Sequence, residues 1–111
     1  MRNRDHGFEN IAPEDLREML DRKDDILLLD VRTPMEHLTD AIAGSRLLPV
    51  QELSFRTNEL PKDREIVVYC RVGNRSAFAA AYLARLGFTV KNLAGGIDAW
   101  NRSGAGAYAV A

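Results

Sequence analysis

The sequence predicts an α/β fold in which a mainly parallel central sheet is flanked by helices on both faces. Along the chain, short apolar runs alternate with helix-like patterns and turn residues, which is typical of βα units. One run, residues 26–29, is continuously apolar and passes directly into Asp30, as expected of a strand buried on both faces. With 111 residues, of which 46% are apolar and 28% charged, the chain fits one packed globular domain.

The first half of the chain predicts a helix, a strand and a second helix. Pro13 suits a first helical position, and apolar residues follow at helical spacing, so we expect a helix from Pro13 to about Arg22. The strand at 26–29 follows. Thr33-Pro34-Met35-Glu36 has the form of a capping box, with a hydroxyl at the cap and glutamate three residues later, and predicts the start of a short helix.

The second half continues the alternation. The β-branched and aromatic run 66–69 is the strongest strand signal, and it leads straight into Cys70. In order, we expect a brief strand at 47–50, a short helix at 51–59, the strand at 66–69, an alanine-rich helix at 75–86, a strand at 88–93 and a short helix around Trp100. The proline in the run 47–50 favours the edge of the sheet or the end of the strand.

Composition excludes several classes of function. Fifteen basic and sixteen acidic residues give a net charge of -1, so we expect neither nucleic acid nor an anionic membrane as a partner. The single cysteine permits neither an internal disulfide nor a Cys-rich zinc site, and His6 and His37 have no metal-ligand spacing. We expect these histidines to be exposed or hydrogen-bonded, with no metal and no cofactor. The basic N-terminus lacks a following apolar stretch, which favours the cytoplasm, where a lone thiol stays reduced.

The segment from Cys70 to Ser76 is the candidate site. It joins the predicted central strand to the start of a helix, where unpaired backbone N–H groups and the positive end of the helix dipole attract an anion. Gly73 permits a tight backbone, and Arg71 and Arg75 add positive charge. A buried, inert thiol is the alternative, but two arginines do not suit an apolar core. We therefore expect an ionised, nucleophilic Cys70.

The remaining residues of this loop are expected to bind the substrate. They are Arg71, Val72, Gly73, Asn74, Arg75 and Ser76.

Other polar residues are expected to support the structure. Asp30 and Arg32, at the end of a buried strand, could bind substrate, but one acid and one base in such a place more often form a structural ion pair and hydrogen-bond network. Glu36 is a further candidate member of this network. Phe78 and Trp100 are predicted to be packing residues. The pair 95–96, Gly-Gly, lacks the lysine and hydroxyl residue of a phosphate-binding loop and is interpreted as a turn.

These features together resemble the rhodanese family. The resemblance rests on Asp30-Val31-Arg32 followed by Glu36, on Cys70-Arg71-Val72-Gly73-Asn74-Arg75, and on the late segment 93–100, Leu-Ala-Gly-Gly-Ile-Asp-Ala-Trp. It implies a rhodanese-like domain at 11–103, with an N-terminal extension at 1–10 and a C-terminal tail at 104–111.

The resemblance also implies a sulfurtransferase. Cys70 would accept a sulfane sulfur as a persulfide and pass it to cyanide, a thiol or a protein acceptor. The loop amides and basic side chains would hold the sulfur anion, and Arg71 would favour a small anionic donor such as thiosulfate. The chain departs from the family pattern at 40–45, Asp-Ala-Ile-Ala-Gly-Ser, which lacks the usual glycine and histidine, and at His37, where an aromatic residue is usual.

Two other functions use similar residues. A cysteine-dependent phosphatase also holds a thiolate among amides, but such enzymes have five residues between cysteine and arginine, whereas four separate Cys70 from Arg75 here. The shorter loop suits one sulfur atom better than a phosphoryl group. A sulfur-carrier or protein-interaction module is the other alternative, and the presence of Cys70 favours an active domain over one that only binds.

Overall fold

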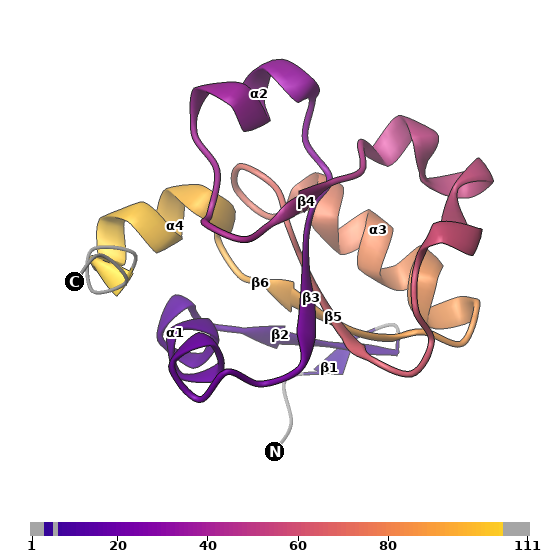
Figure 1. Cartoon of the computed structure of the whole chain (residues 1–111), viewed down its shortest axis with the longest axis horizontal. Coiled ribbons are helices and arrows are strands. Elements are labelled where there is room, and N and C mark those ends of the chain that lie inside the picture. The colour runs from indigo at the N-terminus through magenta and orange to yellow at the C-terminus, as the bar shows by residue number, and fades with distance from the viewer. Residues whose placement is uncertain (1–3, 6, 106–111) are drawn as a thin grey trace.

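A six-stranded sheet forms the centre of the computed structural model, which describes residues 4–5 and 7–105 (Figure 1). The strand order is β1-β2-β6-β5-β3-β4, and every neighbouring pair is parallel except β1 and β2. The strands are β1 (Arg4–Asp5), β2 (Phe8–Ile11), β3 (Ile26–Asp30), β4 (Arg46–Leu47), β5 (Glu65–Tyr69) and β6 (Thr89–Leu93). The predicted α/β fold with a mainly parallel sheet is confirmed.

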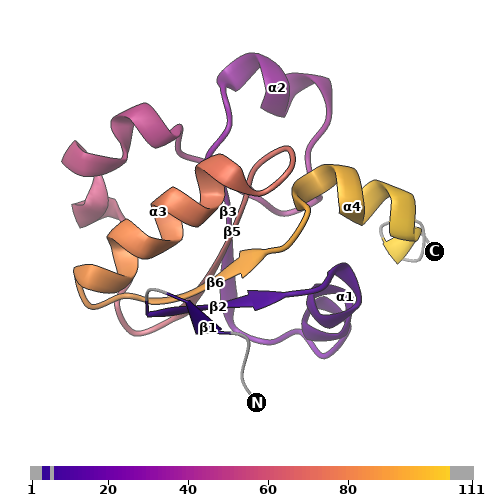
Figure 2. The same cartoon turned by 180° about the vertical axis from the view of Figure 1, so that it is seen from behind.

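Helices cover both faces of this sheet. They are α1 (Pro13–Asp21), α2 (Pro34–Thr39), α3 (Asn74–Arg85) and α4 (Gly96–Ser103), with 3-10 helices η1 (Val50–Phe55) and η2 (Thr57–Glu59). Figure 2 shows α3 beside β5 and β6, with α1 and α4 at the other end of the molecule. No helix in the described part of the chain has the length and apolar character needed to cross a bilayer.

The side chains of β5 show how the two faces are built. Ile66, Val68 and Cys70 belong to the core under α3, whereas Val67 and Tyr69 belong to the core shared with α1 and α4. This alternation follows from the two-residue period of a strand. Because both faces are covered, residues 66–69 of this strand are apolar without interruption.

Several predicted elements differ in detail from those observed. The segment 51–59 contains two short 3-10 helices instead of one helix, and the edge strand β4 ends before Pro49, which cannot donate a ladder hydrogen bond. Strand β2 was not predicted. It lies mostly within the expected N-terminal extension, yet Phe8 is only 2% exposed and belongs to the main core.

The two aromatic residues predicted to pack have different environments. Trp100 is buried in the core beside α1, as predicted. The prediction for Phe78 is wrong, because this side chain is 64% exposed. The buried face of α3 consists of Ser76, Ala79, Ala80 and Leu83, and Phe78 lies outside it. His6 and residues 106–111 of the expected tail lie outside the described residues.

A buried ion pair closes the end of β3. Asp30 and Arg32 are 0% and 2% exposed, and the Asp30 carboxylate accepts hydrogen bonds from Arg32 Nε at 2.9 Å and Nη2 at 2.8 Å. His37 Nδ1 lies 2.8 Å from the same carboxylate, and the Tyr69 hydroxyl donates to it at 3.2 Å. Burial opposes ionisation of Asp30, but the hydrogen bonds from Arg32 and His37 hold its pKa below the ordinary value.

The segment that departs from the family pattern packs around this network. Asp40 accepts a hydrogen bond from Arg32 Nη1 at 3.2 Å, and Ile42 donates its N–H to the Tyr69 hydroxyl at 3.1 Å. Ser45 Oγ lies 2.9 Å from that hydroxyl. The residues that differ from the family pattern therefore include hydrogen-bond partners of the buried Tyr69 hydroxyl.

Replacing Arg32 should destabilise the fold. In Arg32→Ala the buried Asp30 carboxylate loses its cation, so we expect the free energy of unfolding to fall by about 3 to 5 kcal/mol in denaturant titrations. Arg22→Ala is the control, because the Arg22–Asp24 pair is at the surface and should contribute little to stability. An Arg32→Ala protein as stable as the Arg22→Ala control would contradict a structural role for this pair.

Candidate active site

Cys70 lies at the carboxyl end of β5, where the chain turns into α3. The thiol is buried, with 1% of the residue exposed. Gly73 precedes the first residue of α3 and has φ +113, a left-handed conformation that an L side chain rarely adopts. The turn brings the first amides of α3 back over the sulfur, as the sequence predicts for a strand–helix junction.

Three hydrogen bonds converge on the Cys70 sulfur. The backbone N–H of Gly73 donates to Sγ at 3.1 Å, and that of Ser76 donates at 3.3 Å. The Ser76 hydroxyl, which is buried, adds a third at 3.3 Å. The N-terminal turn of α3 is thus directed at the sulfur, which provides partners for a negative charge where water has little access.

These hydrogen bonds favour the thiolate. Burial raises the pKa of the Cys70 thiol, but hydrogen bonds from the Ser76 hydroxyl and from the amides of Ser76, Gly73 and Val72 outweigh it, and the pKa falls below the ordinary value. From the sequence we also expect a lowered pKa for Cys70, but there the expectation rests partly on the positive charges of Arg71 and Arg75. In the structure the hydrogen bonds from the loop have the larger effect, with Ser76 contributing both its amide and its side chain, and the charge interaction between Cys70 and Arg75 raises the pKa of Arg75.

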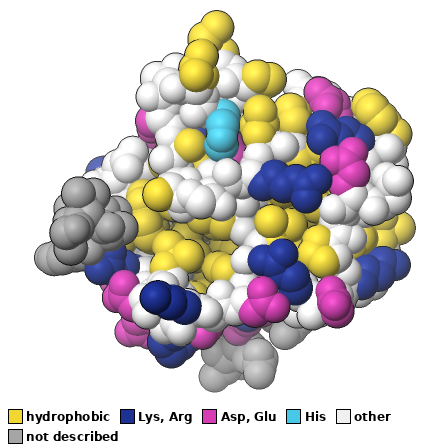
Figure 3. All heavy atoms as spheres, in the orientation of Figure 1, with side chains coloured by type: hydrophobic (Ala, Val, Ile, Leu, Met, Phe, Trp, Pro, Cys, Tyr) yellow, Lys and Arg dark blue, Asp and Glu magenta, His cyan; other side chains and the backbone are white. Residues whose placement is uncertain are grey.

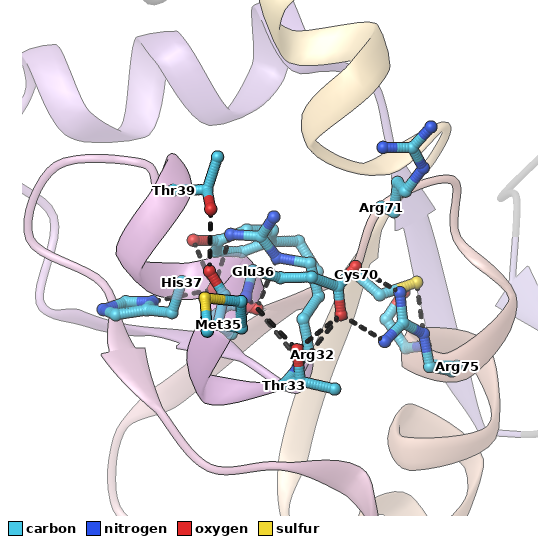
Figure 4. Close-up of polar contacts among 12 residues, drawn as sticks. Arg32, Thr33, Met35, Glu36, His37, Thr39, Cys70, Arg71 and Arg75 are labelled. Atoms are coloured by element: carbon cyan, nitrogen blue, oxygen red, sulfur yellow. Dashed lines mark hydrogen bonds and ion pairs between the residues drawn. The ribbon is translucent and has the colours of Figure 1, made fainter.

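The two loop arginines are placed differently from one another. Arg75 makes a two-pronged ion pair with Glu36, at 2.7 and 2.9 Å, so its guanidinium connects the loop to α2 (Figure 4). The Arg71 side chain is 65% exposed and extends away from the sulfur, with Nε 4.0 Å from the Asp98 carboxylate. Arg71 therefore lies at the rim of the candidate site, whereas the charge of Arg75 is already paired with Glu36.

Glu36 pairs with Arg75 at the start of α3 rather than with the Asp30–Arg32 pair. Its carboxylate also accepts the N–H of Thr33 at 3.0 Å, while its own N–H donates to the Thr33 hydroxyl, so the predicted capping box is confirmed. The hydrogen bonds from Arg75 lower the pKa of Glu36 to about 2, against the smaller effect of burial. The spacing of the capping box predicts where α2 starts. It does not predict that Glu36 pairs with Arg75, because the two residues are far apart in the sequence.

Exposed apolar side chains lie in the Cys70 loop and on α2. Val72 in the loop is 52% exposed, and Met35 and Leu38 of α2 are 71% and 82% exposed. Figure 3 shows apolar side chains protruding at the top of the molecule, where α2 stands. Asn74 is also exposed at the start of α3. Within the described residues, no group of three or more His, Cys, Asp or Glu side chains could hold a metal ion.

Comparison with protein families matches residues 12–103 to the rhodanese-like domain. The chain belongs to the rhodanese-like domain family. A sulfurtransferase from Allochromatium vinosum is 45% identical over 95 residues, which cover 85% of this chain and 89% of that protein. The thiosulfate sulfurtransferase GlpE of Ectopseudomonas mendocina is 35% identical over 94 residues, covering 84% of each chain.

Solved structures agree with this assignment. A rhodanese-related protein from Thermoplasma volcanium superposes with a TM-score of 0.81 at 35% identity, covering 87% of this chain and 94% of that one. The sulfurtransferase relatives indicate a rhodanese-family enzyme.

Removing the Ser76 hydroxyl should make the thiol of this rhodanese-like domain less acidic. Ser76→Ala deletes one donor to Sγ and leaves the backbone donors in place, so the pH midpoint of Cys70 alkylation should move upward. Ser54→Ala, at an exposed position in η1, is the control. A folded Ser76→Ala protein with the wild-type midpoint would show that the hydroxyl does not stabilise the thiolate.

The Glu36–Arg75 pair should give an acid-sensitive contribution to stability. Because the pKa of Glu36 falls from an ordinary 4.5 to about 2, its ionised form stabilises the fold above about pH 4.5, and this contribution is lost as the pH falls toward 2. The stability difference between wild type and Glu36→Gln should therefore be largest near pH 6 and shrink toward pH 2, as measured by urea unfolding. A difference that does not change with pH would exclude the ion pair as its source.

Proposed function

We propose that this rhodanese-like domain transfers a sulfane sulfur from a small anionic donor such as thiosulfate to a thiophilic acceptor through a persulfide on Cys70. The observation that carries the proposal is the convergence of two amides and a hydroxyl on a buried sulfur, at 3.1 to 3.3 Å. Donors preorganised around a sulfur anion stabilise it without the reorganisation that water would require. The sulfurtransferase relatives support the same chemistry.

In the first half-reaction the Cys70 thiolate attacks the outer sulfur of thiosulfate. A bond forms between Sγ and that sulfur, the S–S bond of thiosulfate breaks, and sulfite leaves with the bonding electron pair. The product is a persulfide anion whose charge lies on the terminal sulfur. Val72, Gly73 and Ser76 supply amides to the Cys70 thiol, so the same loop would hold the transferred atom.

In the second half-reaction the acceptor attacks the terminal sulfur of the persulfide. With cyanide, a C–S bond forms, the S–S bond to Cys70 breaks, and its electron pair returns to Sγ as the thiolate. Thiocyanate leaves, and the overall charge is conserved in both steps. A thiol, free or on a protein, would act as acceptor in the same way, and the exposed apolar side chains of Val72 and Met35 would border its approach.

The size of the loop favours sulfur over a phosphoryl group. Four residues separate Cys70 from Arg75, and Arg75 is held by Glu36 rather than extended over the sulfur. Arg71 is the exposed cation at the rim and would attract an anionic donor. The cytoplasm, where a lone thiol stays reduced, is the compartment that fits this use of Cys70.

Cys70→Ser should abolish sulfur transfer without changing the fold. The hydroxyl of serine is close in size to the thiol, but its much higher pKa removes the nucleophile at neutral pH. After incubation with thiosulfate, the intact mass of the wild type should increase by one sulfur atom and return to its original value on addition of cyanide. The mass of Cys70→Ser should not change.

Arg85→Ala is a matched control, because Arg85 lies in the last turn of α3, away from the sulfur. It should acquire and release sulfur like the wild type. A wild-type protein that gains no sulfur from thiosulfate would overturn the proposed donor, and thiocyanate formation by folded Cys70→Ser would overturn the role of Cys70.

A further inference from the structure

We propose that Gly96 is a positioning residue: by letting the first turn of α4 touch the backbone of the Cys70 loop, it orients that loop's amides toward the sulfur. The inference rests on the proposed function and deepens it. It also assigns a role to a Gly-Gly pair that the sequence predicts only as a turn. The contacts that carry it join the loop to α4.

The first turn of α4 binds the carbonyl groups of the active-site loop. The N–H of Ile97 donates to the Cys70 carbonyl at 2.9 Å, and the N–H of Asp98 donates to the Arg71 carbonyl at 3.1 Å. The first N–H groups of a helix have no partner within that helix. Here the loop provides the partners, so α4 begins on the active-site backbone itself.

These hydrogen bonds fix the direction in which the loop amides point. In a planar trans peptide the C=O of one residue and the N–H of the next point in opposite directions. With the Arg71 carbonyl held by α4, the N–H of Val72 faces away from α4, and Val72 is among the amides that lower the pKa of the Cys70 thiol. Two helix starts thus act on one loop: α3 donates to the sulfur, and α4 donates to the carbonyls.

Gly96 is where this arrangement leaves no room for a side chain. A Cβ on Gly96 would lie 2.4 Å from the Cys70 carbonyl oxygen and 2.5 Å from both the carbonyl carbon and oxygen of Arg71. Ordinary contacts between such atoms are about 3.5 Å or longer. All three are backbone atoms, so no rotamer change can relieve the clash. Any side chain would push α4 and the loop apart.

Gly96→Ala and Gly104→Ala form a matched pair for testing this role. Both glycines have positive φ, +62 and +76, and both lie at an end of α4, but a Cβ on Gly104 meets nothing within 4 Å. The two variants therefore introduce similar backbone strain, and only Gly96→Ala disturbs the loop. Each is compared with wild type for thermal stability, for the pH profile of Cys70 alkylation and for sulfur transfer from thiosulfate.

We expect Gly96→Ala to move the alkylation midpoint to higher pH and to lower sulfur transfer at pH 7 at least about tenfold, as befits the loss of preorganised donors. Gly104→Ala should keep the wild-type midpoint and rate, whatever its change in melting temperature. A folded Gly96→Ala protein with the wild-type midpoint and rate would overturn the proposal, and so would equal midpoint shifts in the two variants.

Amide NMR of the wild type gives an independent test should Gly96→Ala not fold. Deprotonation of Cys70 should shift the amide resonances of Ile97 and Asp98, because their carbonyl partners belong to the loop that surrounds the sulfur. The amides of Asn101 and Arg102, further along α4, serve as references. Ile97 and Asp98 resonances that titrate no more than these references would overturn the proposal.

The outcomes separate this inference from the proposed function. Alkylation and NMR report on the thiol and need no sulfur donor. A wild type that takes no sulfur from thiosulfate would refute the proposed activity, while the alkylation midpoints would still decide the role of Gly96. Conversely, an active wild type with an unaffected Gly96→Ala variant would refute only the positioning role.

Discussion

An ionised sulfur withdrawn from water must find its hydrogen bonds within the protein, because a buried charge without partners is too costly to persist. Cys70 meets this requirement with donors drawn entirely from the next six residues of the chain. The conformation of that short segment therefore decides whether the thiolate forms. The left-handed Gly73, the start of α3 and the close approach of Gly96 all lie at this segment, so in the proposed function each would affect the chemistry through this one atom.

Parallel strands bring the supporting groups to the same edge of the sheet. In the register of β3 and β5, Asp30 lies opposite Tyr69, so the chain leaves both strands at one level. The segment after β3 carries Glu36 and the segment after β5 carries Arg75, and the two meet in an ion pair. The Asp30–Arg32 pair is more deeply buried than this ion pair and holds the end of β3 in place.

Local patterns predicted most of the fold, because strand runs, a capping box and an alanine-rich helix act over a few residues. The position of Cys70 at a strand–helix junction was also readable, since chain direction alone places helix amides beside it. The sequence did not predict that Arg75 pairs with Glu36 or that Gly96 lies against the Cys70 carbonyl. Both contacts form only through tertiary packing. Phe78 misled the prediction because its apolar side chain is exposed on a helix whose buried face consists mostly of small residues.

Helix α2 is attached to the rest of the molecule in an unusual way. None of its six residues is buried, and its ties to the body are polar: Glu36 to Arg75 and His37 to Asp30. An element without buried apolar contacts opens at a smaller free-energy cost than the core. The amide protons of α2 should accordingly exchange with solvent well before those of β5, and added salt should weaken the attachment of α2 while leaving the sheet intact.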